Sequence, residues 1–197
     1  MRLVEEKAER SFLVSEDVAE KLSDTKNNQG VFCLCKTLDK NINIGKIKYN
    51  GKYIALESVS NPANFGAVVR TAEAVGLDGV IVSGGCDIYN PKALRASMGS
   101  ALRIPVYSCE NAVELIENLN KKSMLTLAST PDSSAELITD VDMSGGVVSV
   151  IGNEGNGITP ETMSACKKKV TIPMGGRAES LNASTAAAIL IWEMVRK

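Results

Sequence analysis

The chain has 197 residues, 44% of them hydrophobic, which is enough for one sizeable hydrophobic core and a small additional domain. It contains no histidine, which excludes histidine-based catalytic triads and most zinc sites. The net charge is −1 and aromatic residues make up only 4%, so any contact with nucleic acid has to rely on local basic patches.

The cysteine pattern and the apolar runs restrict the cellular setting. Five cysteines without a CxxC spacing predict reduced thiols in a cytoplasmic protein. The start of the sequence is charged and lacks the apolar core of a signal peptide. No apolar run is long enough to span a membrane, and no cluster of metal ligands is visible, so we expect neither a membrane span nor a bound metal.

The N-terminal stretch has a mixed helix and strand pattern. Residues 11–14 and 31–35 are predicted as short strands. Between them, Ser15 is placed to cap a helix that ends at Leu22. We therefore expect residues 1–40 to form a separate N-terminal domain.

Residues 41–52 are interpreted as a basic linker. Lysines predominate in and around it, against the single acidic residue Asp39: Lys36, Lys40, Lys46, Lys48 and Lys52. Two interpretations are open, a solvated linker or a patch that steers RNA toward the protein.

From residue 53 onward, predicted strands and helices alternate. The predicted strands are residues 53–56, 79–82, 104–107, 124–128, 147–151 and 170–172. The predicted helices are residues 62–75, 92–101, 111–120 and 181–196, with a further helical patch before the last strand. This alternation predicts an α/β domain with a parallel, doubly wound sheet over residues 53–197.

Two glycine-rich loops follow predicted strands of this domain. The sequence GNEGNG begins directly after VVSVI, an unbroken apolar run typical of a strand buried on both faces. The sequence PMGG follows the last predicted strand. Glycines let the backbone approach a ligand closely, and α/β sheets bind ligands at the carboxyl ends of their strands. The two loops therefore predict one shared pocket, although ordinary tight turns have the same spacing.

Three stretches of sequence are more specific than the glycine loops alone. They are NPANFGAVVRTAEAVG at residues 61–76, IGNEGNGI at residues 151–158 and IPMGGRAESLNAS at residues 172–184. In order and separation they closely resemble the three signature motifs of the SpoU–TrmH family of RNA ribose methyltransferases. The resemblance covers about residues 52–197. It implies a SPOUT-class methyltransferase domain with a C-terminal trefoil knot that holds the cofactor S-adenosylmethionine.

The resemblance also implies roles for individual residues. The positions that match the family's catalytic site are Asn64, Arg70, Glu154, Ser180 and Asn182. The positions expected to face the cofactor are Ser129, Gly152, Ile172, Met174 and Leu181. Structural roles compete with these assignments, namely helix capping for Asn64 and for the Ser180 and Asn182 pair, and a surface ion pair for Arg70.

The reaction that the resemblance implies is methyl transfer to a ribose 2′-hydroxyl, a weak nucleophile that must lose its proton. Arg70 and Glu154 are the two candidates to accept that proton. An arginine guanidinium is normally always protonated, so we expect Arg70 to orient the hydroxyl and to bind phosphate. Burial near the glycine loop would raise the pKa of Glu154 and make it the easier base. A structural carboxylate that accepts loop N–H bonds is the other interpretation of Glu154.

The N-terminal stretch and the last helix suggest the partners. Residues 15–34, SEDVAEKLSDTKNNQGVFCL, resemble the end of a small ribosomal-protein-like RNA-binding domain that many family members carry, so we expect an incomplete domain of this kind and ribosomal RNA in preference to tRNA. The last helix is apolar nearly all round, which indicates burial on more than one side. Because family members dimerise through this region, the resemblance implies a homodimer.

Three alternatives to an enzyme acting on ribosomal RNA are open. One is a tRNA ribose methyltransferase, because the motifs do not specify the RNA. Another is a non-catalytic RNA-binding protein on the same fold, against which the intact set of catalytic positions argues. The third is an unrelated nucleotide-binding α/β domain, which the three joined motifs disfavour.

Overall fold

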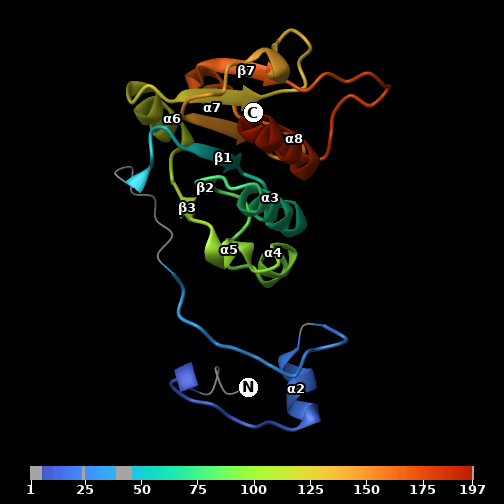
Figure 1. Cartoon of the computed structure of the whole chain (residues 1–197). Coiled ribbons are helices and arrows are strands. Elements are labelled where there is room, and N and C mark those ends of the chain that lie inside the picture. The colour runs from blue at the N-terminus through green and yellow to red at the C-terminus, as the bar shows by residue number, and fades with distance from the viewer. Residues whose placement is uncertain (1–5, 24, 39–45, 197) are drawn as a thin grey trace. The chain divides into compact units, whose positions relative to one another are not determined.

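The computed structural model describes residues 6–23, 25–38 and 46–196. The chain divides into two units, Met1–Leu38 and Asp39–Lys197 (Figure 1). Lys40 and the first part of the predicted linker, residues 41–45, lie outside the described residues.

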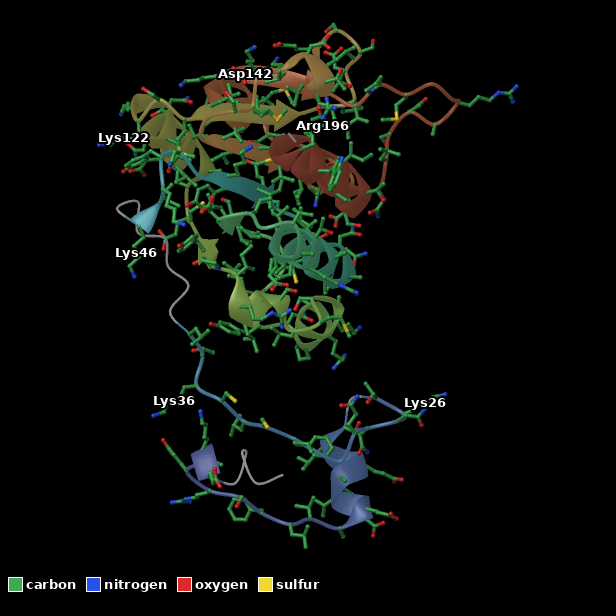
Figure 2. All side chains as sticks on the ribbon, viewed as in Figure 1. Lys26, Lys36, Lys46, Lys122, Asp142 and Arg196 are labelled. Carbon is green, nitrogen blue, oxygen red and sulfur yellow. The ribbon has the colours of Figure 1, made fainter. Side chains whose placement is uncertain are left out.

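In the N-terminal unit, helix α2 (Glu16–Leu22) forms where the sequence predicts it, with Ser15 at the N-cap position. The strands predicted for residues 11–14 and 31–35 are wrong, because these residues form no β-ladder. A strand persists only when its backbone N–H and C=O groups pair with a neighbouring strand. Side chains of this unit extend into solvent (Figure 2). Among the apolar ones, Leu34 is fully exposed. A ribosomal-protein-like domain at residues 1–40 stays a prediction.

The C-terminal unit is built on a parallel sheet, as predicted. Its strands are β1 (Lys52–Glu57), β2 (Gly79–Ser83), β3 (Val106–Ser108), β4 (Leu125–Ser129), β5 (Glu136–Leu137), β6 (Val147–Ile151) and β7 (Lys168–Thr171). Their order in space is β3-β2-β1-β6-β4-β7-β5, and every neighbouring pair is parallel. The VVSVI strand is β6, which is buried throughout and lies between β1 and β4.

Helices cover both faces of this sheet (Figure 1). They are α3 (Pro62–Ala74), α4 (Pro91–Ala96), α5 (Ser100–Arg103), α6 (Ala112–Lys121), the short 3₁₀ helix η2 (Ile138–Asp140), α7 (Pro160–Ala165) and α8 (Ala183–Val195). One core forms between the sheet and the layer of α3 and α8, and a second between the sheet and the layer of α6 and α7. In the part of the chain that the structure describes, no helix is long and apolar enough to cross a membrane.

The single helix predicted for residues 92–101 is wrong, because α4 and α5 are separate helices. Between them, Met98 has a φ of 51° and Gly99 a φ of 83°, so both residues are left-handed. This conformation costs a residue other than glycine about 1–2 kcal/mol. Hydrophobic periodicity does not reveal such a break, because the residues on either side keep their apolar spacing.

Two lysines of the predicted basic linker have structural partners. The Lys48 ammonium forms an ion pair with Asp78, at 2.9 Å from its carboxylate. Lys52 lies at the start of β1, and its ammonium donates to the carbonyl oxygen of Met194 in the last turn of α8. A cation suits this position because the C-terminal end of a helix is negative. Lys52 therefore contributes to the fold.

Ser149 offers a direct test of the packing around β6. Its side chain is fully buried, and its hydroxyl has no hydrogen-bond partner among the described residues. A buried hydroxyl without a partner costs about 1–3 kcal/mol. We therefore expect Ser149→Ala to increase the free energy of unfolding by up to about 1 kcal/mol, as measured by urea denaturation.

The matched control is Thr126→Val in the neighbouring strand β4. The buried Thr126 hydroxyl donates to the Asn120 side chain at 2.7 Å and accepts from the backbone N–H of Lys167 at 3.0 Å. The valine variant leaves both partners unpaired and should lower the free energy of unfolding by about 1–3 kcal/mol. Destabilisation by both substitutions to a similar degree would contradict this assignment of the two hydroxyls.

Candidate active site

The three motifs meet at the carboxyl edge of the sheet. The first begins in the loop between β1 and α3, the second is the loop after β6, and the third leads from β7 into α8. Because β1 and β6 are adjacent parallel strands, their following loops emerge side by side. The third motif joins them because α8 packs against α3 and β6.

The Glu154 carboxylate accepts four hydrogen bonds in this region. Its Oε2 atom accepts hydrogen bonds from the backbone N–H and the hydroxyl of Ser60, both at 3.2 Å. Its Oε1 atom accepts from the backbone N–H of Asn61 at 3.1 Å and from the Asn64 amide nitrogen at 2.9 Å. One side chain from the second motif therefore fixes the start of the first.

Asn64 continues the network to the third motif. Its side chain is 7% exposed, and its Oδ1 atom accepts from the Asn182 amide nitrogen at 3.1 Å. The Oδ1 atom of Asn182 accepts from the backbone N–H of Ser184 at 2.9 Å and so caps α8. The capping interpretation is thus right for Asn182. It is wrong for Asn64, because Asn61 caps α3.

The glycine-rich loop after β6 is shaped by close backbone approach. A Cβ atom on Gly152 would lie 2.0 Å from the carbonyl carbon of Gly157, so a side chain cannot be placed there without moving the loop. Asn153 and Gly157 exchange two backbone hydrogen bonds of 2.9 Å. The Asn153 amide also donates to the carbonyl oxygen of Ser58 at 2.9 Å, which ties this loop to the one after β1.

The pKa of Glu154 is low, not high. Partial burial by itself raises the pKa of this carboxyl, but hydrogen bonds from the Asn64 amide and from backbone N–H groups, its own and those of Ser60 and Asn61, lower it to about 2. The expected rise in pKa is therefore wrong, because the donors around the carboxylate outweigh its desolvation. A carboxylate with such a pKa is a weak proton acceptor at neutral pH.

Arg70 and Ser180 lie outside this network. Both are exposed, and the structure gives neither side chain a hydrogen bond or ion pair within residues 46–196. Arg70 is six residues after Asn64 on α3, which places the two side chains about 120° apart around the helix. Asn64 faces α8, whereas the exposed Arg70 lies on another side of α3.

The five predicted cofactor-facing residues lie along the same edge. Ser129, Gly152 and Ile172 stand at or just after the carboxyl ends of β4, β6 and β7, which lie on the same side of β1. Met174 and Leu181 are half-buried and belong to the segment between β7 and α8. This segment extends away from the sheet (Figure 1).

The backbone of this segment is available to a ligand. From residue 173 to 181 the structure gives no hydrogen bond to any described residue. Backbone N–H and C=O groups beside half-buried apolar side chains suit a ligand with a flat heterocycle and a polar edge. The residues present therefore fit S-adenosylmethionine.

Other binding features lie elsewhere or are absent from the described residues. A small cavity of about 10 Å³ lies under α6 and α7, lined by apolar side chains together with Glu57, Ser83, Cys109 and Thr162. It includes none of the ten predicted site residues. Among the described residues, no group of three or more His, Cys, Asp or Glu side chains is arranged to hold a metal ion.

Comparison with known proteins identifies the family. A model of the SpoU rRNA Methylase family matches residues 51–192. The chain belongs to this family. The match includes all three motifs and confirms the resemblance seen in the sequence.

Similar SpoU-family proteins are known in sequence and structure. RlmP of Bacillus subtilis, a 23S rRNA (guanosine(2553)-2′-O)-methyltransferase, is 28% identical over 93% of this chain and 71% of its own length. A solved RNA 2′-O ribose methyltransferase superposes with a TM-score of 0.78 at 29% identity, over 91% of this chain and 69% of that one. AviRb of Streptomyces viridochromogenes, a SpoU methyltransferase solved with AdoMet, superposes with a TM-score of 0.71 at 26% identity, over 79% of this chain. This chain spans 64% of AviRb, less than two thirds of its length.

Sequence reasoning missed two residues that shape this SpoU-family site. Ser60 supplies two of the four donors to Glu154, and Asn153 anchors the glycine-rich loop. Asn153 carries a recognisable signal, because asparagine beside glycines often bonds the backbone two residues on. Its Oδ1 atom does accept from the backbone N–H of Gly155, at 2.9 Å. Ser60 offers no comparable signal, since its partner is 94 residues away.

Glu154→Gln tests the network through its pH dependence. The variant loses the charge that four donors share, and we expect a free energy of unfolding about 1–2 kcal/mol below that of the wild type at pH 7. The folded pKa lies below the ordinary 4.5, so the carboxylate stabilises fully above about pH 4.5 and loses this effect as the pH falls toward 2. The difference between wild type and variant should therefore shrink over that range.

Denaturant titrations between pH 7 and pH 2.5 measure this difference. Glu117→Gln on the exposed side of α6 is the matched control and should differ little from the wild type at any pH. If the free energy of unfolding of Glu154→Gln stays below that of the wild type by a constant amount down to pH 2.5, the low pKa of Glu154 is refuted.

Proposed function

We propose that this SpoU-family chain is an S-adenosylmethionine-dependent RNA methyltransferase that methylates a ribose 2′-hydroxyl. One observation carries the proposal: the hydrogen-bonded series Glu154, Asn64 and Asn182 joins all three motifs beside the strand ends where the cofactor-facing residues lie. The names of two relatives support it, because RlmP is a 2′-O-methyltransferase and AviRb was solved with AdoMet.

The chain's own residues divide the work of binding. The backbone of residues 173–181 reads the polar edge of the adenine, while Ile172 and Leu181 pack against its faces. Ser129 and Gly152 complete the cofactor site from the neighbouring strand ends. Bound S-adenosylmethionine supplies a methyl group, which leaves the sulfonium sulfur and bonds to the ribose 2′-oxygen as the hydroxyl proton passes to water. Met174 shields the reacting atoms from solvent.

Arg70 contacts the RNA, whereas Glu154 positions other residues of the site. The exposed Arg70 guanidinium binds a phosphate and orients the 2′-hydroxyl. Glu154 positions Asn64 and the loop after β1, since four hydrogen bonds already occupy its carboxylate. Asn182 and Ser180 position the ribose from the start of α8.

Ribosomal RNA is the proposed substrate in preference to tRNA. RlmP acts on 23S rRNA by its name, and it matches 93% of this chain, a share that extends into the N-terminal unit. We assign residues 1–40 to a partial RNA-binding domain on the same grounds. A cytoplasmic location, expected from five cysteines that are all unpaired, remains part of this proposal.

The proposal includes a trefoil knot near the C-terminus. Two features support it: β6 enters the sheet between β1 and β4, both earlier in sequence, and β7 lies beyond β4. From there the chain returns in α8 to pack against α3 and β1. Such crossing over earlier strands is what a chain threaded through its own loop requires.

The proposal also includes a homodimer formed through α8. Leu190 and Ile191 are buried within the chain, but the neighbouring Trp192 is 60% exposed and Ile189 is also exposed. Large apolar side chains on the outside of an otherwise packed helix mark a surface for a partner. A second copy is the proposed partner.

Trp192→Glu tests the dimer. We expect the wild type to scatter light as a dimer at micromolar concentration and the variant as a monomer, because a carboxylate cannot be desolvated in an apolar interface without a partner. Leu137→Glu on β5, a partly exposed apolar position outside α8, is the matched control and should stay dimeric. A wild type that scatters light as a monomer at this concentration would refute the homodimer.

Arg70→Ala tests the catalytic assignment. Wild type incubated with S-adenosylmethionine and unmodified, in vitro transcribed 23S rRNA should produce a 2′-O-methylated nucleoside, detected by mass spectrometry after digestion. We expect Arg70→Ala to lose at least about 100-fold in rate. Its S-adenosylmethionine affinity should stay within about twofold of the wild type, because the guanidinium contacts RNA. Lys121→Gln, another exposed cation outside the basic linker, is the control and should keep full activity.

The outcomes separate the candidate functions. Full activity in Arg70→Ala would overturn the role of that residue alone. Methylation of bulk tRNA but not of 23S rRNA would support the tRNA alternative. A wild type that retains RNA on a filter but binds no cofactor would instead favour the non-catalytic RNA-binding alternative.

A further inference from the structure

Arg70 lies beside the break between α4 and α5. Gly66, Arg70 and Glu73 follow one another along one side of α3, spaced four and three residues apart. A Cβ atom on Gly66 would lie 2.5–2.8 Å from atoms of α4 and of the residue that ends it, so the two helices touch there. The Glu73 carboxylate accepts from the Ser100 hydroxyl of α5 at 3.0 Å. Arg70 lies between these two contacts and therefore faces the break.

The break itself is held in a costly conformation. Met98 is one of three left-handed residues other than glycine among the described residues, and Gly99 follows it in the same conformation. The buried Ser97 fixes the turn from one side, because its hydroxyl donates to the carbonyl oxygen of Leu94 at 2.8 Å and accepts from the backbone N–H of Ala101. Glycine or asparagine adopts such a conformation at lower cost than methionine. Residues held in such costly conformations cluster at functional sites.

The side chains presented by this break are apolar and exposed. Met98 is 67% exposed and Leu102, four residues later, is 61% exposed. They are the two most exposed large hydrophobic residues among residues 46–196. Neither contributes to a core of the sheet, so burial within this chain does not explain them.

The charges around this apolar pair are positive. Lys92 and Arg95 occupy the solvent side of α4, opposite the buried Ala93. Arg103 on α5 is paired with Glu73, at 3.0 Å, which neutralises the one carboxylate of α3 on this side. An apolar pair bordered by cations suits a polyanion whose flat rings can pack on methyl and methylene groups, and this describes RNA.

We infer that Met98 and Leu102 form an RNA-docking face, on which a base or ribose next to the target nucleotide packs. In this arrangement Lys92 and Arg95 contact the flanking phosphates. The docked strand then presents its neighbouring ribose to Arg70. The inference rests on the proposed function and adds to it the surface that positions the RNA.

Two double variants test the docking face. Met98→Asn with Leu102→Gln removes the apolar pair, while asparagine tolerates the left-handed conformation, so the fold should be retained. Lys92→Gln with Arg95→Gln removes the two cations. The matched controls are Leu137→Gln for an exposed apolar side chain, and Lys121→Gln with Lys122→Gln for two exposed cations outside the basic linker. Retention of unmodified, in vitro transcribed 23S rRNA on filters is measured over a range of salt concentrations.

The two variants should fail in different ways. We expect the apolar variant to bind RNA about tenfold more weakly with an unchanged salt dependence, since stacking contacts are not ionic. The charge variant should reduce the slope of log affinity against log salt by about 1.5, because two phosphate contacts are lost. Both variants should keep the S-adenosylmethionine affinity and the thermal unfolding temperature of the wild type, and the controls should match the wild type throughout.

Three results would overturn the inference. One is unchanged RNA affinity in the apolar variant. Another is dissociation of a wild-type dimer into monomers by that variant in light scattering, which would make this face a contact between copies. The third is a wild type that binds S-adenosylmethionine but retains neither 23S rRNA nor tRNA. A wild type that binds RNA through this face but never binds S-adenosylmethionine would support the face and overturn the proposed function, so the two failures are distinguishable.

Discussion

The Glu154 carboxylate holds together the segments on which the rest of the site depends. Four donors from the loop after β1 and from α3 converge on it, and one of them, the Asn64 amide, passes the connection on to Asn182 at the start of α8. Hydrogen bonds to an ionised acceptor are among the stronger ones in proteins. Parallel strands bring the loops to one edge of the sheet, and these contacts, together with the hydrogen bond from Asn153 to Ser58, fix the loops relative to one another.

The same hydrogen bonds limit what Glu154 can do in catalysis. A carboxylate that accepts four of them gains little from taking up a proton, and its pKa falls to about 2. A general base is most effective when its pKa lies near the working pH. The structure therefore separates two tasks, with Glu154 organising the site and the exposed Arg70 on the other side of α3 left to meet the RNA.

Much of this architecture could be predicted from the sequence because local signals agree with the fold. The VVSVI run predicted the central strand β6, and Asn61 followed by Pro62 predicted the start of α3. The wording of the three motifs predicted the family and three residues of the hydrogen-bonded series, Glu154, Asn64 and Asn182. These signals predict structure because they are local. An unbroken apolar run and a capping residue can both be recognised from adjacent residues in the sequence.

Other features could not be predicted because they depend on contacts between distant residues. The left-handed Met98 was not predicted, because methionine carries no sequence signal for this conformation, whereas glycine would. The low pKa of Glu154 depends on donors about 90 residues away, whereas burial alone suggested the opposite direction. Lys52 resembles a solvated linker lysine in the sequence, because its partner, the carbonyl oxygen of Met194 in α8, is 142 residues away. The two short strands expected near the N-terminus failed because a strand pattern does not supply a pairing partner.

The most direct test of the account is a calorimetric titration of the wild-type chain with S-adenosylmethionine and with its demethylated product. The account predicts saturable binding of both ligands with about one site per chain, because every chain carries its own strand ends and its own segment between β7 and α8. A folded protein that binds neither ligand would contradict the assignment of this edge of the sheet as a methyltransferase site.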